Sequence, residues 1–205
     1  MAPVFAGQEN AGSEDLMHDQ TLVKRLKESA PDAIDEIVER YKRPLFSFIV
    51  RITNDHTAAE DIFQETWLRV IRYISKFRGD SKFSTWLFQI ALNLCRDVER
   101  KKKRWLHVPI EDYEDSLVSK QGVDTTRIIK AQQVREIVAT LPEKMREVVV
   151  LRYFHDMSDE EIAEIIGCPE GTVKSRFHRA SKILRKKWEL ANKIESREMN
   201  NYETA

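Results

Sequence analysis

The sequence predicts an all-α protein with two small helical domains joined by a flexible acidic linker. Glycine and proline are scarce, at 6 residues each in a chain of 205. The alternation of apolar and polar residues that is typical of strands is nearly absent, whereas apolar residues recur at helical spacing. Ser158 and Glu161 have the spacing of a capping box, which marks the start of a helix.

Composition excludes several classes of protein. Total charge is balanced, with 34 basic and 34 acidic residues, so a nucleic-acid surface would have to come from local clustering. We expect neither a signal peptide nor a membrane span, because no suitable apolar run occurs. Cys95 and Cys168 lack the spacing of metal ligands, so we expect buried or half-buried reduced thiols in a cytoplasmic protein. No metal and no cofactor is predicted.

The first domain is expected at residues 20–104, after a disordered tail at residues 1–19. A short helix is predicted over residues 20–28. Pro31 is expected to open a longer helix that reaches about Ile52. Within it Pro44 should kink or divide the helix, because proline lacks the backbone donor.

Thr57 and Glu60 predict a capping box at the start of the next helix, which is expected to last to about Phe77. Asp61, Gln64 and Glu65 follow at spacings that place them on one patch. The spacing alone favours an ordinary solvated acidic face over a binding surface.

A loop at residues 79–81 leads into a helix that Phe83 and Trp86 begin. Its outward positions include Asn93, Arg96 and Asp97, followed by a basic run at residues 100–104. Aromatic rings beside a basic run suit single-stranded nucleic acid, since bases stack on rings while cations follow the backbone. The same aromatic spacing also fits a packed core, and both interpretations stay open.

The chain then changes character over an acidic linker expected at residues 105–127, and helical periodicity resumes at Ile128. Pro142 should open a further helix of this second domain, which is expected at residues 128–190. A polar, frayed tail is predicted for residues 191–205.

Two helices joined by a tight turn are predicted within this second domain. Ser158 serves as the N-cap of the first helix, Gly167 ends it in a left-handed conformation, and Pro169 opens the second. Between Gly171 and Trp188 lie seven basic residues and no acidic one. A basic, polar helix braced in this way is typical of a reader of the DNA major groove. The alternative is an ordinary solvated basic face.

Several stretches, taken together, resemble the bacterial RNA polymerase sigma factors of the sigma-70 family, in particular the small extracytoplasmic-function group. The matching stretches are 61–67, 77–87, 90–93, 141–142 and 170–180, in the order of the family. The likeness extends over about residues 22–190. The chain lacks the middle domain of larger members, which places it in the small group.

The resemblance implies three surfaces. The clamp helices of the largest subunit of core polymerase would be bound by Asp61, Gln64 and Glu65. The flap region of the polymerase is a second implied partner surface. The second surface would melt the −10 element by pulling a base out of the stack. Its residues would be Arg78, Gly79, Lys82, Phe83, Ser84, Thr85, Trp86, Asn93, Arg96, Asp97, Arg100 and Lys101. The −35 duplex would be bound by Ser158, Glu170, Gly171, Thr172, Lys174, Ser175, Arg176, His178, Arg179 and Lys182.

The resemblance also implies an anti-sigma protein as a partner, and a linker that threads toward the polymerase active centre. Two other classes of function compete with this one. A helix-turn-helix regulator would bind duplex DNA without polymerase. A DNA-acting enzyme would need a nucleophile near clustered arginines, or grouped carboxylates, and the sequence offers neither, so no catalytic residue is predicted.

Overall fold

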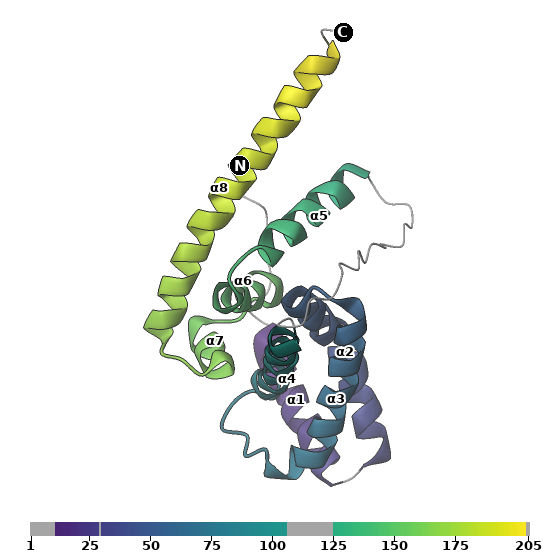
Figure 1. Cartoon of the computed structure of the whole chain (residues 1–205). Helices are drawn as coiled ribbons and strands as arrows, with labels where there is room; N and C mark the ends of the chain where they lie inside the picture. The colour runs from purple at the N-terminus through teal and green to yellow at the C-terminus, as the bar shows by residue number, and fades with distance from the viewer. Residues whose placement is uncertain (1–10, 29, 106–124, 204–205) are drawn as a thin grey trace.

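The computed structural model describes residues 11–28, 30–105 and 125–203, and every regular element in these ranges is helical (Figure 1). The predicted all-α fold class is therefore confirmed. The first lobe holds α1 (Ala11–Lys27), α2 (Pro31–Thr53), α3 (His56–Tyr73), the short 3₁₀ helix η1 (Ile74–Lys76) and α4 (Phe83–Trp105). The second lobe holds α5 (Thr125–Ala139), α6 (Glu143–His155), α7 (Asp159–Ile166) and α8 (Glu170–Glu203). Within these ranges no helix is both long and apolar enough to span a membrane.

The first helix is longer than predicted. It begins at Ala11 rather than at residue 20, so the prediction of a disordered tail was wrong for residues 11–19. The physical reason lies at Asp19, which is buried, accepts a hydrogen bond from the Tyr41 hydroxyl, and pairs with Arg40 Nε at 3.0 Å. Burial, and then this bond to Asp19, raise the pKa of Tyr41 well above its ordinary value. Residues 1–10 lie outside the described part.

Two predictions about helix boundaries in the first lobe also need correction. Of the two outcomes expected for Pro44, a kink or a division, the division is excluded, because α2 is continuous around it. The N-cap of α3 is Asp55 rather than Thr57, and its Oδ1 accepts a bond from the Ala58 amide at 2.9 Å. Asp55 has the extended backbone (φ −145°) that an N-cap needs, whereas Thr57 already lies inside the helix.

Aromatic side chains at the start of α4 close the core of the first lobe. Phe83 is only 3% exposed and packs edge-on against Tyr41, with centroids 5.5 Å apart. The ring centroids of Phe77 and Trp86 lie 5.1 Å apart. These rings therefore serve the core, which was one of the two interpretations that the sequence left open.

The second lobe carries the predicted pair of helices. The Ser158–Glu161 capping box is complete, and Gly167 has the left-handed φ of 75° that ends α7. Pro169 directly precedes α8, and its carbonyl accepts from the Thr172 amide at 2.8 Å. Pro142 likewise directly precedes α6.

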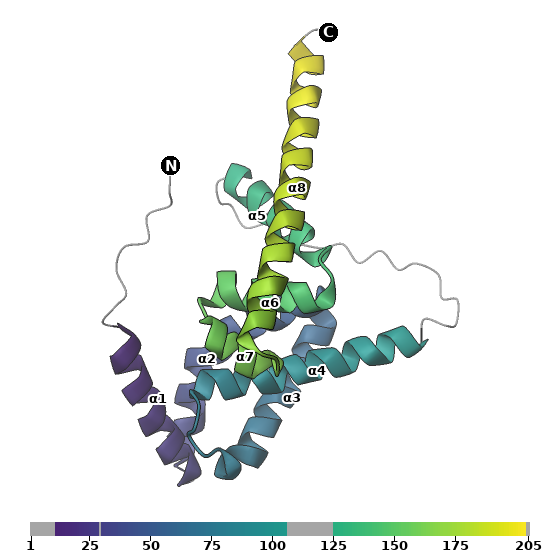
Figure 2. The ribbon, with the colours of Figure 1, turned by 90° about the vertical axis from the view of Figure 1, so that its left-hand side faces the viewer.

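The ends of this lobe differ from the predictions. Helix α5 begins at Thr125, three residues earlier than the predicted Ile128, and the linker residues 106–124 lie outside the described part. The prediction of a frayed tail was wrong for residues 191–203, because α8 remains helical to Glu203 and projects away from the body (Figures 1 and 2).

The lobes pack directly against each other. Helix α4 lies against α7 and α2 lies against α6, as Figure 2 shows from the side of the second lobe. Nothing in the sequence predicted this contact. It matters for function because α4 carries most of the predicted −10 residues.

Candidate nucleic-acid interfaces

The basic face of α8 is open to solvent. Its exposed members include Gly171, Lys174, Ser175, His178, Arg179 and Lys182. On the opposite side Val173 and Ala180 are fully buried and anchor the helix against α6 and α7. The predicted −35 residues therefore lie mostly on one accessible face of a rigid helix.

Six predicted −35 residues have additional local contacts. Arg176 is half-buried and its Nη1 lies 3.8 Å from Cys168 Sγ. Glu170 pairs with Lys174 at 3.6 Å, and Ser158 is occupied by the capping box. The Thr172 carbonyl accepts from the Ser175 hydroxyl at 3.0 Å. Of this set, Arg179 and Lys182 are exposed cations without an ion pair among the side chains that the structure describes.

The predicted −10 residues divide by exposure. Arg78, Gly79, Asn93, Arg100 and Lys101 are exposed, and Ser84, Trp86 and Asp97 are half-buried. Phe83 and Thr85 are 3% and 2% exposed, so in this conformation they support the loop from the core side. Gly79 has a φ of 83°, a backbone conformation that glycine adopts without strain.

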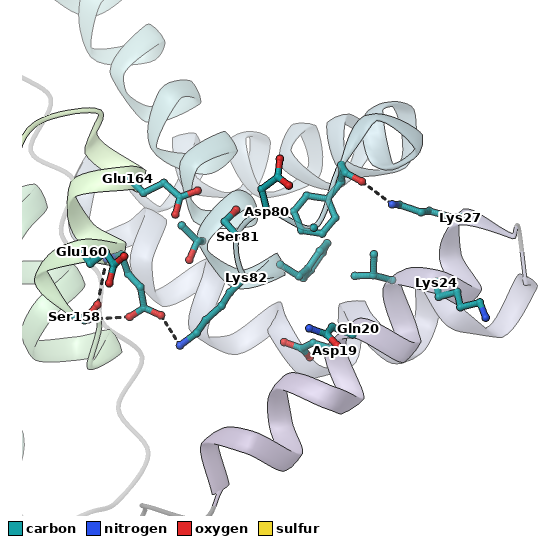
Figure 3. A pocket seen from close by; sticks show the side chains of 16 residues that line it. Asp19, Gln20, Lys24, Lys27, Asp80, Ser81, Lys82, Ser158, Glu160 and Glu164 are labelled. Atoms are coloured by element: carbon teal, nitrogen blue, oxygen red, sulfur yellow. Dashed lines mark hydrogen bonds and ion pairs between the residues drawn. The ribbon is translucent and has the colours of Figure 1, made fainter.

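Lys82 is engaged by the second lobe. Its Nζ lies 2.7 Å from Oε1 of Glu161, and Figure 3 shows the side chain reaching from the loop toward α7. Burial on its own would raise the pKa of Glu161, but bonds from Lys82 and from the Ser158 backbone outweigh it and lower that pKa. Both residues line a cleft of about 670 Å³ between α1, the loop and α7.

Arg96 is engaged more fully. It forms a bidentate salt bridge with the Glu147 carboxylate of α6, in which Nε donates to Oε1 at 2.7 Å and Nη2 donates to Oε2 at 2.8 Å. Its Nη1 also donates to the Ile166 carbonyl at 3.3 Å, at the end of α7. The bond to Glu147 raises the pKa of Arg96. Sequence reasoning missed Glu147, which is 1% exposed, because nothing local marks a buried acid whose partner is in the other lobe.

The acidic patch on α3 is only partly open. Asp61 and Gln64 are exposed, whereas Glu65 pairs with Arg69 at 2.8 Å. Two apolar side chains that sequence reasoning missed continue the same stripe one and two turns on. Leu68 is 57% exposed and Ile71 is 53% exposed. Polar groups followed by exposed apolar ones on one helix face favour a protein partner.

A second surface of this kind lies in the second lobe. An apolar groove of about 480 Å³ between α5, α6 and α8 is lined largely by hydrophobic side chains, among them Val134, Tyr153, Leu184 and Trp188. Its residues were predicted only as helix stripes. The helical spacing predicted an apolar stripe on these helices, but it could not predict that the stripes enclose a groove.

The cysteines match the prediction. Cys95 is fully buried, and burial, followed by the charge of Glu147, raises its pKa to about 12. Cys168 is half-buried. Across the described ranges no cluster of His, Cys, Asp and Glu is suited to hold a metal ion.

Two family models match the chain in order. The model described as Sigma-70 region 2 matches residues 37–105, and the model described as Sigma-70, region 4 matches residues 131–184. The chain is also 35% identical over 176 residues to the ECF RNA polymerase sigma factor SigW of Bacillus subtilis, covering 80% of this chain and 93% of that protein. This is a sigma factor of the extracytoplasmic-function group.

Other relatives agree with this assignment. The sigma factor is 33% identical to the RNA polymerase sigma-H factor of Pseudomonas aeruginosa, over 82% of this chain and 92% of that protein. The ECF RNA polymerase sigma-E factor of Escherichia coli is 31% identical, over 81% and 92%. The chain therefore belongs to the proteins that direct RNA polymerase to promoters, and the alternative of a regulator that acts without polymerase is not favoured.

Two solved structures resemble this sigma factor in fold. One is the sigma factor RpoE of Bartonella quintana in complex with the anti-sigma factor NepR, at 25% identity and a TM-score of 0.64, covering 77% of this chain and 98% of that chain. The other is CnrH in complex with the cytosolic domain of CnrY, at 23% identity and a TM-score of 0.65, covering 84% and 97%.

Proposed function

We propose that this sigma factor docks on core polymerase through α3, opens the −10 element with the loop before α4 and with α4 itself, and reads the −35 duplex with α8. The observation that carries the proposal is the position of the three surfaces. The α3 stripe and the −10 residues fall inside the region 2 match, and the basic face of α8 falls inside the region 4 match. The first lobe thus has a protein-binding face and a nucleic-acid face.

The docking face on α3 combines Asp61 and Gln64 with Leu68 and Ile71. Acidic and amide groups give register against a basic partner helix. Exposed Leu68 and Ile71 add apolar area that is released from water on binding. Glu65 already has Arg69 as a partner at 2.8 Å, so it contributes less than its neighbours.

The −10 face combines a glycine loop with exposed cations. Arg78 and Gly79 lie on the loop, and Asn93, Arg100 and Lys101 follow along α4. Cations hold the backbone of a separated strand, while the loop wall of the cleft offers a place for an unstacked base. Phe83 and Thr85 support this wall from inside.

The −35 face needs no movement to meet DNA. Lys174, Arg179 and Lys182 are exposed on one side of α8, with Ser175 and His178 between them. Cations on such a face hold phosphates, and short polar side chains at the amino end reach base edges.

Further partners follow from the remaining surfaces. The apolar groove between α5, α6 and α8 fits an amphipathic segment of the polymerase flap region. An anti-sigma protein is a further proposed partner, because the similar sigma factor RpoE of Bartonella quintana was solved in complex with the anti-sigma factor NepR. We assign the chain no enzymatic activity of its own, no cofactor, and a place in the cytoplasm.

The docking face is tested by binding to purified core polymerase. The triple change Asp61→Ala, Gln64→Ala and Glu65→Ala should weaken binding by about tenfold, since it removes the register-setting groups. The double change Asp35→Ala and Glu160→Ala removes two exposed acids from other surfaces and should leave binding unchanged. Equal affinity for the triple variant and the unmodified chain would show that α3 is not the docking face.

A further inference from the structure

The loop before α4 is free at its crest and held at its two ends. Residues 78–80 are exposed, and a side-chain carbon built at Gly79 would meet no atom within 4 Å. The position of the crest is therefore set from Phe77 on one side and from the first turn of α4 on the other. On the α4 side the Trp86 amide donates to the Lys82 carbonyl at 3.2 Å.

Phe77 is fixed through its amide, its ring and its carbonyl. The amide donates to the Ile74 carbonyl at 3.1 Å and ends η1. The side chain is 8% exposed, and its ring packs against the rings of Phe83 and Trp86. The carbonyl accepts a hydrogen bond from Lys27 Nζ at 2.5 Å, which joins residues 50 apart in the chain (Figure 3). This last bond attaches the start of the loop to α1.

The helix that supplies Lys27 is itself firmly held. Leu22 and Val23 are 1% and 6% exposed, and Arg25 Nη1 lies 2.9 Å from Glu36 Oε2 on α2. The Lys27 ammonium also lies 5.7 Å from the centroid of the Phe77 ring. A cationic donor suits this place, because carbonyls at the end of a helix lack partners within it. Helix α1 precedes the region 2 match, which begins at residue 37, and yet it reaches the loop that lies inside that match.

We infer that α1 braces the −10 loop and that Lys27 is a positioning residue for promoter opening, acting through the Phe77 carbonyl. The inference rests on the proposed −10 function of the loop. A loop that is already held in place loses less conformational freedom when it takes up an unstacked base, so binding is stronger. The role is one of positioning, since the Lys27 ammonium is engaged by the protein rather than presented to DNA.

Three variants of the full chain isolate this bond. Lys27→Met removes the ammonium and keeps an apolar stem of similar length. Lys27→Arg keeps a cationic donor and should restore most of what the Met variant loses. Lys24→Met is the matched control, because it removes the same charge one turn earlier on α1, where the ammonium has no bond to the loop in the described part of the chain.

Hydrogen exchange measured by NMR tests the brace in the free chain. The Phe77 amide should exchange about fivefold faster in Lys27→Met, the scale of one partly exposed charge-assisted hydrogen bond. It should keep its original rate in Lys24→Met. The Trp86 amide, at the other end of the loop, should exchange equally in all variants and so shows that the fold is intact. An unchanged Phe77 rate in Lys27→Met would overturn the inference.

Promoter opening is measured with holoenzyme on a genomic fragment that gives a discrete run-off transcript. Permanganate oxidises unpaired thymines and so reports the ratio of melted to closed −10 element. Lys27→Met should lower this ratio about fivefold, with Lys27→Arg close to the unmodified chain. Core binding and DNase protection of the −35 duplex should not change. An equal loss of opening in Lys24→Met and Lys27→Met would overturn the inference, because the charge of α1 would then matter and not the bond.

The salt dependence of promoter binding separates positioning from a direct contact with DNA. Positioning leaves the salt slope unchanged in Lys27→Met, whereas a phosphate contact made by Lys27 would reduce it by about 1 and overturn the inference. Arg78→Ala, on the loop itself, separates the brace from the proposed function. If Arg78→Ala impairs opening and Lys27→Met does not, the brace alone is rejected. If neither change impairs opening, the proposed −10 function of the loop is rejected and the brace with it.

Discussion

Acid should destabilise this fold through one half-buried histidine, His155. His155 lies between Phe48 and Phe88, and its Nε2 has no hydrogen-bond partner in the described part of the chain. Burial, and then the positive charge of Arg51, lower the pKa of His155 from 6.5 to about 4.

The sign of the effect follows from where the proton binds. Above the ordinary pKa of 6.5 the imidazole is neutral in both the folded and the unfolded chain, so His155 makes no pH-dependent contribution there. Between 6.5 and about 4 only the unfolded chain takes up the proton, so the free energy of unfolding decreases. The loss is about 1 kcal/mol at about pH 5.5 and approaches about 3 kcal/mol below about pH 4.

Urea unfolding at about pH 7.5 and about pH 5.5 measures this loss, with His155→Phe as the matched variant. Phenylalanine keeps an aromatic ring between Phe48 and Phe88 and cannot titrate. The unmodified chain should lose about 1 kcal/mol more than the variant on acidification. Glu161, whose lowered pKa also makes the fold less stable in acid, affects both chains equally. Equal losses, or an NMR titration that places the His155 pKa near 6.5, would refute the reasoning.

Three other outcomes are expected. Gly167→Ala should lower the free energy of unfolding by about 1 kcal/mol, because φ is 75° although the site has open space, whereas Gly171→Ala at helical φ should cost nothing measurable. Denaturation curves of the two variants make the comparison. Arg179→Ala should weaken −35 duplex binding and reduce the salt slope by about 1, while Lys187→Ala, farther along α8, should change neither by as much. Iodoacetamide should modify Cys168 before Cys95 in the folded chain, because burial raises the pKa of Cys95 to about 12; mass spectrometry of timed samples would show a reversed order if Cys95 were accessible.

The sequence predicted well those features that depend on neighbouring residues. The capping box at Ser158 and the left-handed Gly167 each depend on residues within one turn of each other, so their spacing contains the answer. Asp55 and Thr57 show the limit of this reasoning. Both offer a side-chain acceptor near the start of α3, and only the backbone conformation decides that Asp55 caps it.

Contacts between the lobes could not be predicted in the same way. Arg96 and Glu147 are 51 residues apart, and Gln89 and Glu164 are 75 apart, so neither pair leaves a periodic signal. From the sequence Arg96 was an outward cation, and in the fold it still lies on the predicted face. That face is covered by a second lobe whose docking the sequence did not indicate. The start of α1 was missed for a similar reason, since Asp19 is held by Tyr41 and Arg40 of the next helix.

Run-off transcription with purified bacterial core polymerase tests the central claim most directly. Genomic fragments serve as templates, with core alone and with core plus this chain. The account predicts discrete transcripts that require the chain and that diminish for the Asp61, Gln64 and Glu65 triple variant. No chain-dependent transcript, from a preparation in which the chain is folded and core is active, would contradict it.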